Sequence, residues 1–405
     1  MRNRSSCFYR RCFLPLCGSF FLFILLGPIA AQGATYYVSL SGKDSNSGTS
    51  TSAPFRTLLR AVQPLRPGDT LYLRGGTWTE QLDLMKYNTS GTSGKYIKIA
   101  GYPGETVTIR YAEPLAGGYG PIKARGASGY LIFENFVLDG INMPAATGWQ
   151  ITSSNHHFVL RNLEIKNFRY NGIYTAGNDI QVINCKIHDN KPPTSTGYYY
   201  GIYASRGSNL LIQGNQIYNN SGGGLHLYPG PLAAPLIKNN SIHNNNYQAK
   251  SPVGGIILYG SSSGAISNAK VYNNLVYRNG TSSSGSATGI RLHNTTGTKL
   301  LNNTIYANKT YGLQVSSNNS STVAQNNIIY GNSAGNYSNL SSSTTYTNNI
   351  TTDPKFVSAS SNNFQLQSSS PAVNKGVFLS TVPNDYRNIA RPKGATHDIG
   401  GYENY

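Results

Sequence analysis

The sequence predicts an all-β protein folded as a single parallel β-helix, and its composition and an internal repeat carry this prediction. Only 12% of the 405 residues are charged, about half the usual share in a soluble globular protein, which argues against charged helical bundles and disordered chains. The 30 Tyr and 44 Gly residues, with abundant Asn, Ser and Thr, favour strands and turns over helices. A short phrase that recurs every 22 to 34 residues between about 120 and 350 indicates stacked coils.

The first 34 residues are expected to be a secretory signal peptide. Four arginines precede an apolar run at 20–26, and Gly27-Pro28 and several small residues follow it. A membrane anchor is disfavoured because the run is short for a span and Gly-Pro interrupts it. Cleavage would remove four of the 33 basic residues and none of the 15 acids, so the net charge would fall from +18 to +14. We therefore expect bacterial-type export to the periplasm, cell surface or medium, without a membrane span afterwards.

Residues 35–352 are predicted to form the β-helix with its N-terminal cap, and residues 353–405 a loop-rich C-terminal cap. Solenoids need their ends covered. The segment 53–65 has the apolar spacing of a short amphipathic helix, which can cover the N-terminal end. The strand Thr70–Leu73 and the turn after it then begin the coils, and the repeat stops past Asp353.

Each repeat carries two phrases that read as short parallel strands. The first has an Asn, two residues later an aliphatic residue, and then Tyr or His, as in Asn215-Gln216-Ile217-Tyr218 and Asn240-Ser241-Ile242-His243. The second begins with Gly, as in Gly201-Ile202-Tyr203 and Gly224-Leu225-His226-Leu227. Alternation places the aliphatic residues inward and the residue between them outward. The aligned Asn residues are expected to form an internal hydrogen-bonded ladder, in which Cys185 takes one position as a buried small hydrophobe.

Both ends of the mature chain resemble secreted bacterial β-helix proteins of the pectate-lyase-like superfamily. Pro54-Phe55-Arg56-Thr57 and the phrase from Pro67 to Gly76 are similar to the N-terminal region of polysaccharide lyase family nine, and Arg391-Pro392 and 398–403 to a common C-terminal element. The resemblance implies a right-handed parallel β-helix and export. It is less specific for activity, because fold does not imply function.

The sequence departs from family nine where that family places an Asp cluster for calcium and a Lys base. The matching positions hold Ser205, Tyr228, Tyr259 and His293, and no acid occurs between Asp189 and Asp353. Calcium wants six to eight oxygen ligands, usually with several carboxylates, and a glycoside hydrolase needs two carboxylates. A calcium site is thus disfavoured though possible, and no metal or other cofactor is expected.

Aligning the second phrases predicts two outward columns, which together form a stripe of Tyr, His and basic residues. The candidate catalytic residues are His226, Tyr228, Tyr259, Arg291 and His293, and the candidate substrate-binding residues are Lys123, Arg125, Tyr174, Tyr203 and Arg206. Tyr rings stack on sugar faces, and Arg and Lys pair with carboxylates or sulfates. The span 190–352 holds nine basic residues and no acid. The stripe therefore suits an acidic polysaccharide.

β-Elimination from a uronate needs a group that neutralises the carboxylate, a base and an acid. Arg291 or Lys123 can neutralise, His226 or His293 can act as the base, and Tyr228 or Tyr259 can deliver the proton. The sequence therefore predicts a metal-independent lyase. Two alternatives stay open: a non-catalytic carbohydrate-binding or surface solenoid, and a uronate epimerase.

Two further histidines are expected to be structural, and nucleic acid is not expected as a partner. His188 and His243 fall in another column beside Tyr218 and Tyr277, where a structural ladder is expected. Positive charge alone would suit nucleic acid, but no known nucleic-acid-binding module appears and export argues against it. A monomer is expected.

Overall fold

The computed structural model describes residues 33–111, 120–124, 126, 128–143, 146–191, 199–246, 253–262, 264–280, 287–339 and 341–404. Residues 33–405 form one compact unit. The expected signal peptide falls almost entirely on residues 1–32, outside the described part of the chain. No helix among the described residues has the length and hydropathy to cross a membrane.

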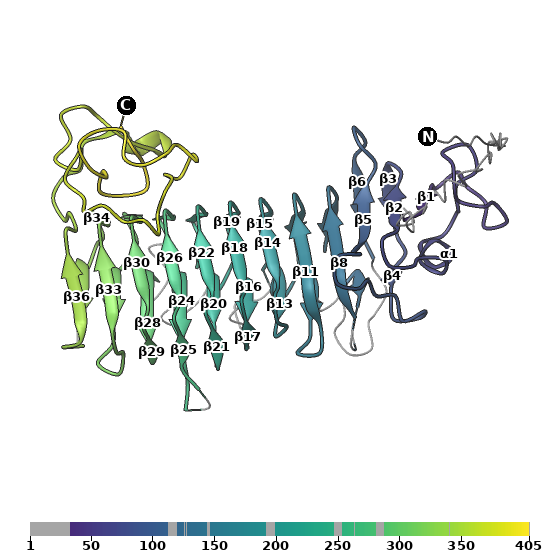
Figure 1. The fold of residues 1–405 in the computed structure, drawn as a ribbon, viewed down its shortest axis with the longest axis horizontal. Helices are drawn as coiled ribbons and strands as arrows, with labels where there is room; N and C mark the ends of the chain where they lie inside the picture. The colour runs from purple at the N-terminus through teal and green to yellow at the C-terminus, as the bar shows by residue number, and fades with distance from the viewer. Residues whose placement is uncertain are drawn as a thin grey trace, which may run out of the picture. The chain divides into compact units, whose positions relative to one another are not determined.

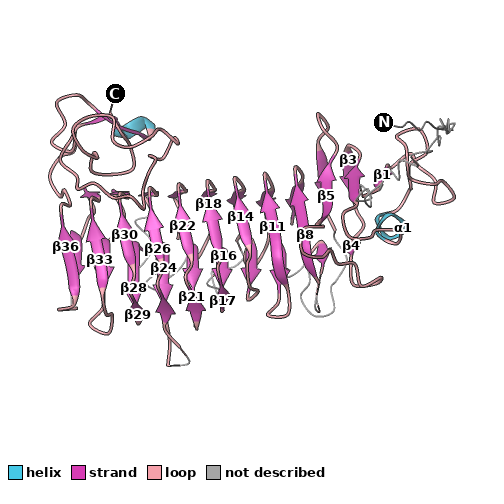
Figure 2. Cartoon of the chain, viewed as in Figure 1, coloured by secondary structure: helices cyan, strands magenta, loops and turns pink. Residues whose placement is uncertain are grey.

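The described chain is a parallel β-helix, as predicted, with a long sheet on each of three faces (Figures 1 and 2). The 12-stranded sheet has the order β1 (Thr35–Val38), β2 (Thr70–Leu73), β5 (Ile97–Gly101), β8 (Gly129–Glu134), β11 (His156–Arg161), β14 (Gln181–Ile183), β18 (Leu211–Gln213), β22 (Leu236–Lys238), β26 (Lys270–Tyr272), β30 (Lys299–Leu301), β33 (Thr322–Gln325) and β36 (Thr344–Thr347).

The 10-stranded sheet follows it along each coil. Its order is β3 (Gly76–Trp78), β6 (Val107–Ile109), β9 (Val137–Asp139), β12 (Glu164–Lys166), β15 (Lys186–His188), β19 (Gln216–Tyr218), β23 (Ser241–His243), β27 (Leu275–Tyr277), β31 (Thr304–Tyr306) and β34 (Ile328–Tyr330).

The 8-stranded sheet comes next along the coil and carries the predicted stripe. Its order is β10 (Trp149–Ile151), β13 (Ile173–Thr175), β16 (Tyr200–Ala204), β20 (Gly223–Leu227), β24 (Val253–Tyr259), β28 (Ala287–His293), β32 (Tyr311–Val315) and β35 (Gly335–Asn339). A 4-stranded sheet then leads back to the 12-stranded sheet through β17 (Gly207–Ser208), β21 (Leu232–Ala233), β25 (Ile266–Ser267) and β29 (Thr295–Thr296). The phrases predicted at least two strands in a coil, and the coil formed by β16, β17, β18 and β19 has four.

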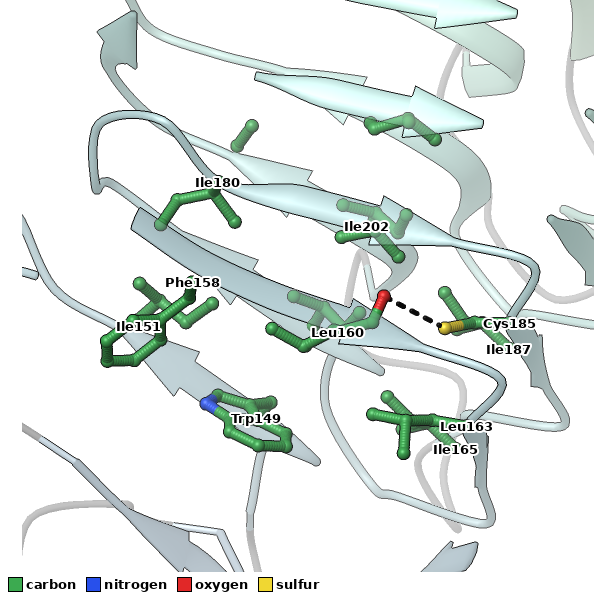
Figure 3. Packing of buried hydrophobic residues seen from close by; sticks show 14 of the residues in the cluster. Trp149, Ile151, Phe158, Leu160, Leu163, Ile165, Ile180, Cys185, Ile187 and Ile202 are labelled. Atoms are coloured by element: carbon green, nitrogen blue, oxygen red, sulfur yellow. Dashed lines mark hydrogen bonds between the residues drawn. The ribbon is translucent and has the colours of Figure 1, made fainter. Parts of the chain in front are cut away.

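The core is the column of inward side chains that the coils stack on one another. Ile187, Ile217 and Ile242 are in register on the 10-stranded sheet and fully buried. Figure 3 shows the packing around Trp149, Phe158 and Leu160. Cys185 is buried there, as predicted, with its Sγ 3.6 Å from the carbonyl oxygen of Leu160 (Figure 3). Burial raises the pKa of the Cys185 thiol to about 12, so this thiol is a packing group.

Two buried Asn ladders flank the strands of the 10-stranded sheet, one just before and one just after them, and the first is the predicted one. Asn240 Nδ2 donates to Asn274 Oδ1 at 2.9 Å, and Asn274 Nδ2 donates to Asn303 Oδ1 at 3.0 Å. Cys185 takes the predicted position, because its backbone N–H donates to Asn215 Oδ1. The second ladder holds Asn190, Asn220, Asn245, Asn279, Asn308 and Asn332.

The N-terminal end carries the expected helix, which is shorter than the predicted segment 53–65. Helix α1 spans Leu58–Val62, and the Thr57 side chain accepts a hydrogen bond from the Arg60 N–H at its start. Leu58, Ala61 and Val62 are buried. The short strands β4 (Leu82–Asp83) and β7 (Ile122–Lys123) pair nearby.

The C-terminal segment lies along the flank of the last coils, over their turns and the outer face of the 10-stranded sheet. It holds β37 (Phe356–Ser358), the 3-10 helix η1 (Ala359–Ser361) and β38 (Asn363–Leu366), which pairs antiparallel with β37. Phe364 packs on Tyr277, with ring centroids 4.7 Å apart. Asn273 Nδ2 donates to the carbonyl oxygen of Asn384 at 2.7 Å, so the turn amides also hold this segment.

Candidate active site on the 8-stranded sheet

The strands of the 8-stranded sheet place the predicted first column on its outer face, in register, except for Lys123, which lies on β7 of another sheet. Tyr174 pairs with Tyr203, Tyr203 with His226, His226 with Ile257, and Ile257 with Arg291. A Gly opens these strands because the backbone there is tightly packed; a Cβ on Gly224 would lie 2.4 Å from Ile242 Cγ2. The alternation predicted from the sequence is therefore present.

The aromatic residues of the stripe form one chain of ring contacts along the coils. Tyr174 stacks on Tyr203 at 5.8 Å between ring centroids, and His226 lies 5.5 Å from Tyr203. His226 then stacks on Tyr228 at 5.4 Å, Tyr228 meets Tyr259 edge-on at 5.6 Å, and Tyr259 stacks on His293 at 4.0 Å. The structure thus brings together the four predicted aromatic and imidazole catalytic candidates.

His226 is a partly buried imidazole at the centre of these ring contacts. Tyr200, on the same strand as Tyr203, also packs on His226, with ring centroids 4.6 Å apart. Burial and, to a smaller extent, the nearby Arg291 charge lower the pKa of His226 to about 3. Its Nδ1 is buried without a hydrogen-bond partner among the described residues. His226 is therefore neutral near pH 7.

His293 is held by two side chains that assign its tautomer. Asn318 Oδ1 accepts from the Asn294 backbone N–H at 3.2 Å, which turns the Asn318 amide nitrogen toward His293 Nε2, also at 3.2 Å. Nε2 is then an acceptor, and Nδ1–H donates to Ser316 Oγ at 3.2 Å. Burial, followed by the Arg291 charge, lowers the pKa of His293. The Nε2 lone pair is thus already engaged.

Arg291 and Arg206 are the described basic residues beside the stripe. The Arg291 guanidinium carbon lies 5.7 Å from the Tyr259 ring centroid, over the ring. Arg206 is exposed and lines a neighbouring hollow of about 400 Å³ with Ala176. Lys123 lies on β7 at the N-terminal side, where its Nζ is 2.9 Å from Asp83 Oδ2. Arg125 lies outside the described residues.

The basic excess of residues 190–352 is spread over several faces and does not gather on the stripe. Lys238, Lys270 and Lys299 lie on strands of the 12-stranded sheet. Arg278 binds the C-terminal segment, through Asn362 Oδ1 at 2.7 Å and the Ala359 carbonyl oxygen at 2.8 Å. Sequence position alone did not show which charges share a face, because neighbouring residues on a coil belong to different sheets.

Tyr200, Ser316 and Asn318 belong to the site environment but were not assigned roles from the sequence. Tyr200 is buried and packs with Ile257 beneath Tyr203 and Tyr259. The run of three Tyr before Gly201 in the sequence could have pointed to Tyr200. Asn318 had no signal, since it lies in the turn after β32 and reaches His293 of the preceding coil.

The residues of the stripe do not fit a calcium site. The second outward column holds Ala176, Ser205, Tyr228, Tyr259 and His293, without a carboxylate. Calcium prefers several carboxylate oxygens among six to eight ligands. Among the described residues, no group of three or more His, Cys, Asp or Glu side chains is arranged to hold a metal ion.

The family model described as Pel9A-like, right handed beta helix region matches residues 36–363. The chain belongs to this family. Pectate lyase PEL9 of Emericella nidulans is 29% identical over 224 residues, which are 52% of this chain and 53% of that protein. The uncharacterized protein YwoF of Bacillus subtilis is 42% identical over 78 residues, which are 19% of this chain and 16% of that protein. The matches thus span about half or less of these curated relatives.

Two solved structures share the fold of this Pel9A-like chain over most of its length. The crystal structure of pectate lyase Pel9A has a TM-score of 0.67 and 20% identity, and the match covers 93% of this chain and 97% of that one. A rhamnogalacturonan lyase has a TM-score of 0.59 and 18% identity, with coverage of 88% and 99%. At these identities the likeness shows the fold alone.

Proposed function

We propose that this protein is an exported polysaccharide lyase that cleaves an acidic, uronate-containing polysaccharide without a metal ion. The observation that carries the proposal is the unbroken chain of contacts from Tyr203 through His226, Tyr228 and Tyr259 to His293, with Arg291 over Tyr259. It supplies aromatic surface for sugar rings and a cation for a carboxylate on one face. The name of the sequence relative, pectate lyase PEL9, supports the reaction class.

In the proposed reaction, Arg291 pairs with the uronate carboxylate and His226 takes the proton from the adjacent carbon. The electron pair of that C–H bond forms the new carbon–carbon double bond, and the glycosidic C–O bond breaks. Tyr228 or Tyr259 donates a proton to the leaving oxygen. His226 is assigned as the base because the lone pair of His293 Nε2 is engaged by Asn318.

The position of Arg291 couples substrate binding to the basicity of His226. The positive charge of Arg291 contributes to the low pKa of His226. A uronate carboxylate that pairs with Arg291 cancels this charge at the imidazole, so the pKa of His226 rises as the substrate binds. The base would therefore strengthen only in the complex.

The test compares wild type with His226→Ala and a matched control, His243→Ala. His243 is also a partly buried imidazole with a lowered pKa, of about 4, but it stacks between Tyr218 and Tyr277 on the 10-stranded sheet. With a panel of polyuronates and sulfated glycans, we expect wild type to form unsaturated products detected by ultraviolet absorbance. His226→Ala should lose at least about 100-fold in rate and His243→Ala little. Equal rates in wild type and His226→Ala would reject the assignment of the base.

A non-catalytic carbohydrate-binding solenoid is the second candidate. The low pKa of His226 and the engaged Nε2 of His293 favour it, because both leave weak bases in the free protein. Retention of a polyuronate without unsaturated product would support binding alone. A change in uronate stereochemistry without cleavage would support the third candidate, a uronate epimerase.

A further inference from the structure

A second polar groove lies at the N-terminal end, away from the 8-stranded sheet. A hollow of about 630 Å³ is bounded by the loop 41–54 and by the turn after β2. Its lining includes the hydroxyls of Ser39, Ser41, Thr51 and Ser52, the ammonium of Lys43 and the carboxylate of Glu105. This dense set of donors and acceptors matches what the hydroxyls of a sugar require.

Three tyrosines stand beside this hollow on the outer face of the 12-stranded sheet. Tyr37 and Tyr72 pair in register and stack with centroids 5.9 Å apart, and Tyr102 meets Tyr72 edge-on at 5.7 Å. All three are partly exposed. Arg74 joins them to the hollow, since its guanidinium lies 4.5 Å from the Tyr102 ring centroid and also lines the hollow.

Three charged side chains line the hollow, and two of them, Arg74 and Glu105, pair with each other; Lys43 is the third. Both Glu105 oxygens accept from Arg74 Nε at 2.9 Å, and Glu105 Oε2 also accepts from the Gly75 N–H at 2.6 Å. This arrangement lowers the pKa of Glu105, with the Arg74 hydrogen bond as the main cause. A polyanion therefore finds little net charge here, and a neutral, hydroxyl-rich chain fits better.

The hollow continues along the turns that join the 12-stranded and 10-stranded sheets. A second hollow of about 460 Å³ shares Glu105 and is lined by the turn residues Asn135, Asn162 and Asn184. Farther along the same turn column, Asn239 Nδ2 donates to the Asp385 carbonyl oxygen at 3.1 Å, where the C-terminal segment lies. These turn amides thus present hydrogen-bonding groups at the spacing of the coils, about 4.8 Å.

We propose that the two hollows and the group Tyr37, Tyr72 and Tyr102 form a binding groove for a neutral polysaccharide chain. The groove is separate from the stripe and does not depend on lyase activity. The tyrosine rings stack on sugar faces, and the hydroxyls and turn amides bind sugar hydroxyls. Its ligand class differs from that of the stripe because Arg74 and Glu105 neutralise each other and hydroxyls make up most of the remaining polar lining.

The experiment is affinity electrophoresis of the full chain in native gels that contain hydroxyethylcellulose, β-1,4-galactan, polygalacturonate or gelatin. We expect retardation by at least one neutral polysaccharide. Tyr72→Ala should weaken this binding about tenfold, as the loss of one stacked ring predicts. Ser41 lies in an exposed loop, so Ser41→Trp should fill the hollow without disturbing the core. This variant should also weaken binding of the neutral polysaccharide. Tyr228→Ala on the stripe is the matched control and should leave the retardation unchanged.

Three outcomes would overturn the groove while leaving the lyase proposal standing. The first is migration of wild type at its control rate in both neutral gels. The second is equal retardation of wild type, Tyr72→Ala and Ser41→Trp. The third is retardation by gelatin alone, which would make the turn amides a site for an extended polypeptide, as they are for the C-terminal segment.

Discussion

Replacement of Asn274 by Ala tests the ladder that runs through the coils. Asn274 Oδ1 accepts from both the backbone N–H and the Nδ2 of Asn240, at 3.1 and 2.9 Å. Its own Nδ2 donates to the Ile237 carbonyl oxygen at 2.9 Å and to Asn303 Oδ1 at 3.0 Å. All of these groups are buried, so water cannot replace the lost partners.

The loss in the free energy of unfolding depends on which hydrogen-bonding groups remain without a partner in Asn274→Ala. The backbone N–H of Asn240 and one N–H of its Nδ2 both lose the partner that the ladder supplies, and each unsatisfied buried donor costs about 1–3 kcal/mol. The bonds donated by Asn274 are lost with the donor itself, each worth about 0.5–1.5 kcal/mol net. We therefore expect the free energy of unfolding to fall by at least about 3 kcal/mol, and the small cavity adds to this loss.

The assay is urea unfolding followed by circular dichroism, with Asn384→Ala as the matched control. Asn384 is exposed in the C-terminal segment, and its substitution should change stability by less than about 0.5 kcal/mol. The converse variant is Cys185→Asn, which places an amide in the same column near the Leu160 carbonyl oxygen and the Asn215 side chain. It should keep or raise stability.

A result that refutes the reasoning is equal stability of Asn274→Ala and Asn384→Ala. A clear loss of stability in Cys185→Asn would also count against it, because the ladder would then not accept an added amide. The free energy of unfolding could also change its slope against urea concentration while the urea midpoint stays the same. This would indicate altered cooperativity of the solenoid and would contradict the explanation by lost hydrogen bonds.

Two further predictions concern buried charge. Removal of the Arg291 charge in Arg291→Gln should raise the pKa of His226 from about 3, yet keep it below 6.5 because burial is the larger cause; imidazole proton NMR measures this, and an unchanged or lower pKa would contradict it. Glu403→Gln should cost about 3–5 kcal/mol in urea unfolding, because Arg391 pairs with Glu403 where both side chains are fully buried. Arg56→Gln, at an exposed ion pair, should cost less than about 1 kcal/mol, and equal losses would reject this reasoning.

The periodic features of the protein were predictable because they repeat along the chain. The register of Tyr203, His226 and Arg291 followed from aligning Gly-led phrases, and the structure pairs them as expected. The ladder position of Cys185 followed in the same way. Each of these features depends on the alternation of side chains within a strand and on the similarity of successive coils. Both can be read from a single sequence.

The non-periodic features were not predictable in this way. The C-terminal segment was expected over the end of the coils, and it lies along their flank through contacts such as Tyr277 with Phe364. The bond between Asn318 and His293 joins a turn to the preceding coil and follows no repeat. Such contacts depend on the lengths and paths of individual turns and loops.

The sequence by itself therefore determined the solenoid, its inward aliphatic columns and the residues that face outward together. The tertiary structure decided how deeply His226 is buried, which basic residues stand beside it and where the C-terminal segment lies. The physical reason is that side-chain direction is set locally by the strand, whereas burial and electrostatic environment are set by every element packed nearby. The pKa of His226 illustrates this difference, since Tyr200 from the preceding coil packs on its ring and the charge of Arg291, two coils farther on, acts on it.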